Sequence, residues 1–78
     1  MRQRIPRLIM TFPSTTEAIR AEQILTEQKI PGRMIPTPTS ITAGCGLAWR
    51  SEPGVEEQLR EIAQKQQINY EKLLVLEL

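Results

Sequence analysis

Arg7-Leu8-Ile9-Met10-Thr11-Phe12-Pro13-Ser14-Thr15-Thr16-Glu17 is the stretch that decides the fold, because it joins a predicted buried strand directly to a predicted helix. The apolar run 7–12 ends at a proline, which cannot donate a hydrogen bond to a strand ladder. Ser14 and Glu17 have the spacing of a capping box, with Ser14 as the helix cap and Glu17 reaching back to it. We therefore expect a strand over 7–12 and a helix that begins near Ser14.

Outward from this stretch the chain continues to alternate between strands and helices. The first helix, near Ser14–Gln28, has an apolar stripe and should end before the turn at Ile30-Pro31-Gly32. A second helix, near Pro53–Gln67, has one apolar face, with favourable Glu–Arg and Glu–Lys pairs at i,i+4 on its other side. Further strands are predicted over the ranges 33–36, 47–50 and 72–78.

The resulting order is β-α-β-β-α-β. Right-handed crossovers then favour an α+β fold, the ferredoxin-like βαββαβ sandwich, with a four-stranded antiparallel sheet and both helices on one face. The 78 residues suffice for a single domain over 1–78.

Both faces of the first and the last predicted strand are apolar, although two helices can cover only one face of a sheet. Residues alternate without a polar face in 8–12 and again in 73–78. A sparse open face, which small domains tolerate, is one interpretation; a self-association surface is the other. Because so short a chain buries only about 60% of its unfolded surface, we expect a homo-oligomer formed through the sheet face or the edge strands.

Composition excludes several classes of protein. The formal net charge is +1, with one cysteine and no histidine, so we expect no nucleic-acid partner, no disulfide and no metal site. The basic start, Met1–Arg4, precedes no long apolar run, and no segment is long enough to span a membrane. These features predict a cytoplasmic protein without a membrane partner.

Three arginines have two possible interpretations. Arg7, Arg33 and Arg50 are predicted to gather at the strand ends opposite the cysteine, either for solubility or as a docking patch for a partner. Only three aromatic residues are present, and no run resembles an RNA-binding sheet signature, which argues against RNA binding.

The single thiol, Cys45, lies in a small, polar loop over 37–46 and is flanked by Gly44 and Gly46. The glycines remove side-chain shielding and let backbone amides approach the sulfur. The first and third strands are neighbours in this topology, so Cys45 should lie near the start of the first helix. That helix terminus favours a nearby anion, and donors to a thiolate or bound anion are expected from the hydroxyls of Ser14, Thr15 and Thr16.

A small core residue without chemical consequence is the alternative interpretation of Cys45. The chain contains no Cys-x-x-Cys motif, which excludes a self-contained thioredoxin-like cycle. It also contains no histidine for a Cys–His pair, which argues against cysteine-hydrolase chemistry.

The sequence resembles the selenium/sulfur carrier protein-like domains from about Leu8 to Gln67. The resemblance is carried by Thr11-Phe12-Pro13-Ser14-Thr15, Ala18, Ala21-Glu22, Ile30-Pro31, Ile35-Pro36-Thr37-Pro38, Ile41 and Cys45-Gly46-Leu47-Ala48. Trp49 departs from the pattern, which usually has an aliphatic residue there.

The resemblance implies a carrier protein rather than an enzyme. Cys45 would carry sulfane sulfur or selenium as a covalent adduct, without another cofactor. The partners would be a sulfur or selenium donor enzyme and an acceptor protein. Two alternatives remain open: a non-catalytic interaction or regulatory module that acts through its apolar sheet face, and a thiol redox sensor that forms an intermolecular disulfide.

Overall fold

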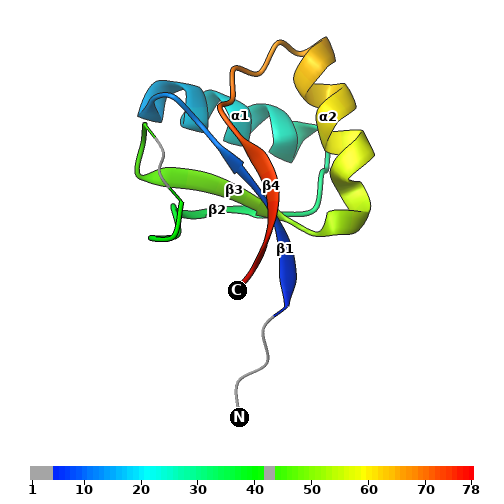
Figure 1. The fold of residues 1–78 in the computed structure, drawn as a ribbon. Coiled ribbons are helices and arrows are strands. Elements are labelled where there is room, and N and C mark those ends of the chain that lie inside the picture. The colour runs from blue at the N-terminus through cyan, green and yellow to red at the C-terminus, as the bar shows by residue number, and fades with distance from the viewer. Residues whose placement is uncertain (1–4, 42–43) are drawn as a thin grey trace.

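The computed structural model describes residues 5–41 and 44–78; the basic start of the chain and positions 42 and 43 of the predicted loop lie outside these ranges. The elements are β1 (Pro6–Thr11), α1 (Thr15–Glu27), β2 (Arg33–Pro36), β3 (Leu47–Ser51), the 3-10 helix η1 (Pro53–Val55), α2 (Glu56–Lys65) and β4 (Leu73–Glu77). The strands form one antiparallel sheet in the order β2-β3-β1-β4, and both helices cover the same face (Figure 1). The predicted α+β, ferredoxin-like βαββαβ sandwich is confirmed.

The start of α1 follows the predicted cap in part. The Ser14 side chain accepts a hydrogen bond from the Glu17 N–H at 3.3 Å, as the capping box requires. The Glu17 carboxylate, however, lies 3.9 Å from the Arg20 guanidinium, and within the described ranges it makes no return bond to Ser14. One half of the predicted box therefore forms, and the Glu17 carboxylate instead faces Arg20, three residues further along the same helix.

The core lies between the sheet and the two helices. Alternate residues of β1 and its extension, Leu8, Met10 and Phe12, point into it and are fully buried. The helices contribute their predicted stripes, Ala18, Ala21 and Leu25 from α1 and Leu59 and Ala63 from α2. The small alanines let α1 approach the sheet closely, which explains why so short a chain can close a core.

Trp49 fills the centre of this core, and a short polar chain satisfies its indole. The indole N–H donates to the Ser51 hydroxyl at 2.7 Å, and that hydroxyl donates to the Pro31 carbonyl at 2.7 Å. Trp49 and Ser51 are both buried, so each of these polar groups needs its partner. The turn before β2 is thereby tied to β3.

Gly32 is required where this turn crosses β3. A Cβ at position 32 would lie 2.6 Å from the Ser51 hydroxyl and 2.8 Å from Trp49 Cε2, and would also overlap the Arg50 carbonyl oxygen. The backbone there also has φ near +156°, which side chains rarely adopt. The turn predicted at Ile30-Pro31-Gly32 therefore depends on its glycine for packing.

Among residues 5–41 and 44–78, four large apolar side chains are exposed, and two of them, Ile5 and Leu78, extend the β1–β4 ladder through reciprocal backbone hydrogen bonds. Val75, 48% exposed, lies on β4, whose outer edge has no partner strand in the described sheet. The expected homo-oligomer stays a prediction. None of the described helices is long and apolar enough to cross a bilayer.

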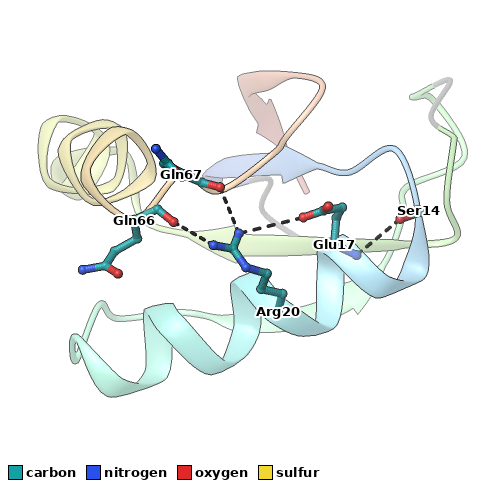
Figure 2. A network of polar contacts seen from close by, with 5 residues as sticks. All are labelled: Ser14, Glu17, Arg20, Gln66 and Gln67. Carbon is teal, nitrogen blue, oxygen red and sulfur yellow. Dashed lines mark hydrogen bonds and ion pairs between the residues drawn. The ribbon is translucent and has the colours of Figure 1, made fainter.

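A network of polar contacts joins α1 to the residues that follow α2 (Figure 2). The Arg20 guanidinium donates to the carbonyl oxygens of Gln66 and Gln67, each at 2.9 Å. The last carbonyls of a helix lack intrahelical partners and carry partial negative charge, so a cation there is favourable. Arg20 thus caps α2 across the helix interface.

Replacing Arg20 with methionine should lower the free energy of unfolding by about 1 kcal/mol, because the last carbonyls of α2 lose two charge-assisted donors at a half-exposed site. Arg60→Met is the matched control, since Arg60 pairs only with Glu56 one turn earlier on the same helix and should cost about 0.3–0.5 kcal/mol. Urea unfolding of both variants measures the difference. Equal losses would contradict a capping role for Arg20.

Gly32→Ala should lower the free energy of unfolding by about 2 kcal/mol, because the added methyl group overlaps β3 backbone and the Trp49 ring. Gly54→Ala adds the same group where no atom lies within 4 Å, and it should leave stability nearly unchanged. The midpoint of urea unfolding, followed by Trp49 fluorescence, compares the two. A Gly32→Ala variant as stable as Gly54→Ala would contradict the packing described here.

Candidate functional site

Cys45 lies in the connection from β2 to β3, two residues before β3 begins. The Thr37 N–H donates to the Gly46 carbonyl at 2.8 Å, and the Thr37 hydroxyl donates to the Cys45 carbonyl at 3.1 Å. These bonds continue the pairing of β2 with β3 past the last ladder pair, Pro36 with Leu47. The backbone that carries the thiol is therefore held by the sheet.

The sulfur has close polar neighbours on its own strand and on α1. The Leu47 N–H points at Cys45 Sγ, with 3.3 Å between nitrogen and sulfur, and the Leu47 carbonyl lies 3.5 Å from the same sulfur. The Thr15 hydroxyl, in the first turn of α1, is 4.0 Å from Sγ. Cys45 is half-buried and packs against the helix-side core, so its sulfur is neither fully enclosed nor fully free.

Gly44 anchors the loop from the other direction. Its N–H donates to a Glu71 carboxylate oxygen at 3.0 Å, which ties the loop to the segment that leads into β4. A Cβ on Gly44 would lie 2.9 Å from the Pro13 carbonyl oxygen, a contact that only glycine avoids. Gly46, by contrast, has no atom within 4 Å of the corresponding position apart from its chain neighbours, so a side chain there would meet no steric obstacle.

The structure brings together some of the predicted site residues and separates others. Cys45, Gly44 and Thr15 meet where α1 begins. The Ser14 hydroxyl is occupied by the Glu17 N–H, and Thr16 is exposed without a contact to Cys45 in the described part of the chain. The expected donors from the helix terminus therefore reduce to the Thr15 hydroxyl.

Three contributors were not predicted from the sequence: the Leu47 N–H, the Thr37 hydroxyl and the Glu71 carboxylate. Leu47 and Thr37 follow from the hairpin register, which a sequence pattern leaves open. Glu71 reaches the loop because its own N–H pairs with the Thr11 carbonyl at 2.8 Å beyond the end of the β1–β4 ladder. Only a prediction of the register between β1 and β4 could have placed Glu71 near the loop.

The chemistry available here is that of one thiol with donors around it. The chain has no second cysteine and no histidine to act as a resolving thiol or a base. Residues 5–41 and 44–78 contain no group of three or more side chains suited to hold a metal ion. Any group exchanged at Cys45 must therefore come from another molecule and leave to another molecule.

Comparison with known proteins agrees with this arrangement. No curated protein and no solved structure matches the chain at a significant level. A protein-family model described as "Putative Se/S carrier protein-like" matches residues 7–75. The matched range includes both ends of the site, Thr15 and Glu71, and the loop with Cys45 between them. By this match over most of its length, the chain belongs to the selenium/sulfur carrier protein-like family.

Proposed function

We propose that the protein is a carrier that binds one sulfane sulfur or selenium atom on Cys45 and delivers it to an acceptor. The observation that carries the proposal is the placement of the sole thiol in a carrier-family chain. Its sulfur lies beside the Leu47 backbone N–H, at 3.3 Å, and near the Thr15 hydroxyl, at 4.0 Å. An inert core cysteine would be enclosed by side chains, and this one is half-buried.

Loading is an exchange of one sulfur–sulfur bond for another. The Cys45 thiolate attacks the terminal sulfur of a persulfide on the donor protein; the bond inside the donor persulfide breaks, and its electron pair leaves on the donor thiolate. Cys45 then holds the persulfide. A donor that carries selenium transfers it by the same displacement and produces a selenosulfide. No external oxidant or reductant is consumed.

Delivery reverses these roles. An acceptor nucleophile attacks the outer sulfur or selenium, and the Cys45 thiolate is the leaving group. The Leu47 N–H and the Thr15 hydroxyl point toward the sulfur and can donate to it in the loaded and the empty protein. In this scheme the protein is a substrate of its donor rather than an enzyme, and a reducing compartment such as the cytoplasm keeps its thiol available.

Two features of the loop support such a cycle. The bonds made by Thr37 and Glu71 hold the backbone on both sides of the thiol, so little chain entropy is lost when a partner engages it. The thiol is only half-buried, so an atom added to the sulfur can extend toward solvent. A carrier needs both a defined position for the sulfur and room for its cargo.

Incubation with a cysteine desulfurase and cysteine, or with selenite and a thiol, should add the mass of one sulfur or selenium atom to the chain. Tandem mass spectrometry should place the adduct on Cys45, and the adduct should be released by dithiothreitol. Cys45→Ser, treated identically, is the blank. A wild-type protein that stays unmodified under both conditions would overturn the carrier proposal; an intermolecular disulfide in place of the adduct would favour a redox sensor.

Gly44→Ala should make Cys45 alkylate several-fold faster in the folded protein, because the added methyl group pushes the loop off the Pro13 carbonyl and exposes the half-buried sulfur. Gly46→Ala is the matched control and should react at a rate close to wild type, since nothing crowds that position. Iodoacetamide labelling followed by mass spectrometry measures both rates. In urea the wild type and both variants should react at the same rate. If Gly44→Ala leaves the rate of the folded protein unchanged, the Gly44–Pro13 contact does not shield the thiol.

A further inference from the structure

The sheet face opposite the helices has a composition of its own. Residues directly opposite each other in an antiparallel pair share a face, so the register assigns this open face residue by residue. No helix within the described ranges covers it (Figure 1). We call it the open face; its members are Arg7, Ile9, Thr11, Arg33, Ile35, Ala48, Arg50, Leu74 and Leu76.

Two cations stand directly side by side on the open face. Arg33 of β2 is the register partner of Arg50 of β3, and like charges in that arrangement destabilise a sheet. Neither arginine has an ion pair or side-chain hydrogen bond in the described part of the structure. Arg7, on the same face, is paired with Glu52 and so is neutralised. No acidic side chain in the described part of the chain compensates the repulsion between Arg33 and Arg50.

Apart from Arg7 and Thr11, the other members of the open face are apolar. The row that contains the two arginines continues across the sheet through Ile9 to Leu74. Ile9, Thr11 and Ala48 are fully buried, so the apolar surface that a partner can reach lies on Ile35, Leu74 and Leu76, which are partly exposed. At the end of the ladder Ile5 and Leu78 are 45% and 40% exposed. A complementary surface therefore needs carboxylates over β2 and β3 and apolar side chains over β1 and β4.

The residues of the open face indicate which kind of molecule can bind there. Single-stranded nucleic acid binds sheet faces by stacking on aromatic rings, yet Phe12 and Trp49 are buried on the helix side and Tyr70 packs against the same core. A second copy meeting the open face by two-fold symmetry would present the same set of residues, and none of them is a carboxylate. Glu52, which directly follows β3, is already paired with Arg7. Neither occupant supplies what Arg33 and Arg50 lack.

We propose that the open face is a docking surface for a partner protein, which contributes an acidic segment with interspersed apolar residues. Its carboxylates pair with Arg33 and Arg50, and its apolar side chains cover Leu74 and Leu76. Cys45 lies beyond the opposite end of β3 from Arg50, roughly 16 Å along the extended chain, and its side chain packs against the core on the helix side. A partner held on the open face leaves the thiol uncovered.

The test uses a fluorescein-labelled peptide of mixed Glu and Leu residues and a matched peptide with Gln in place of every Glu. The protein carries Cys45→Ser, so sulfur chemistry does not enter and failure of the carrier proposal leaves this test intact. Fluorescence anisotropy measures affinity, and amide chemical-shift mapping identifies the face. We expect the acidic peptide alone to bind, with shifts concentrated on β2, β3 and β4.

Arg33→Gln with Arg50→Gln should weaken peptide binding about tenfold, and it should not lower stability in urea, because it removes a like-charge pair. Arg60→Gln with Lys65→Gln is the matched control: it removes the same charge from α2, and binding should change by less than about twofold. Equal losses in the two double variants, or shifts confined to the helices, would overturn the proposal. So would tighter binding of a poly(U) oligonucleotide, or concentration-dependent self-association that the first double variant abolishes.

Discussion

Burial of the central strand is the constraint on which the rest of the structure depends. Every residue from Leu8 to Phe12 has no solvent exposure. Full burial of such a side chain contributes about 1.5–3 kcal/mol, a large share of the stability of so small a domain. The strand is paired on both edges, with β3 and β4. Each of the other elements is placed by its contact with this strand or with a neighbour of it.

The end of β1 also positions the thiol loop. The Thr11 backbone pairs with Glu71 and Lys72, and the Thr11 hydroxyl accepts from the Lys72 N–H at 3.2 Å. This brings the Glu71 carboxylate to Gly44. Pro13, two residues past Thr11, presents its carbonyl to the same glycine. The two segments that contact Gly44, at Pro13 and at Glu71, both adjoin strands of the sheet. The location of Cys45 therefore follows from the strand register rather than from the local conformational propensity of the loop.

The two faces of the sheet differ in composition. On the helix face, the Trp49 ring is accommodated because its N–H donates to the Ser51 hydroxyl, which in turn donates to the Pro31 carbonyl. Cys45 packs against that same core. The open face holds Arg33 and Arg50 instead, which have no ion pair within residues 5–41 and 44–78. The proposed cargo site and the proposed docking surface therefore lie at different ends and on different sides of β3.

The sequence by itself determined the elements and the class of the fold. Local signals were sufficient there: Ser14 caps α1, the stripe of Ala18, Ala21 and Leu25 is buried, and the expected ion pairs of α2 form. The same signals picked out Cys45 and the glycine beside it that packs against Pro13. Only the tertiary structure decided which groups surround the thiol loop. Thr15 approaches the sulfur, whereas Thr37 and Glu71 hold the loop backbone, and each reaches its place through a pairing between segments that are separate in the sequence. The tertiary structure also decided that Arg33 and Arg50 are direct neighbours, since a shift of one residue in strand register would send one of them to the opposite face.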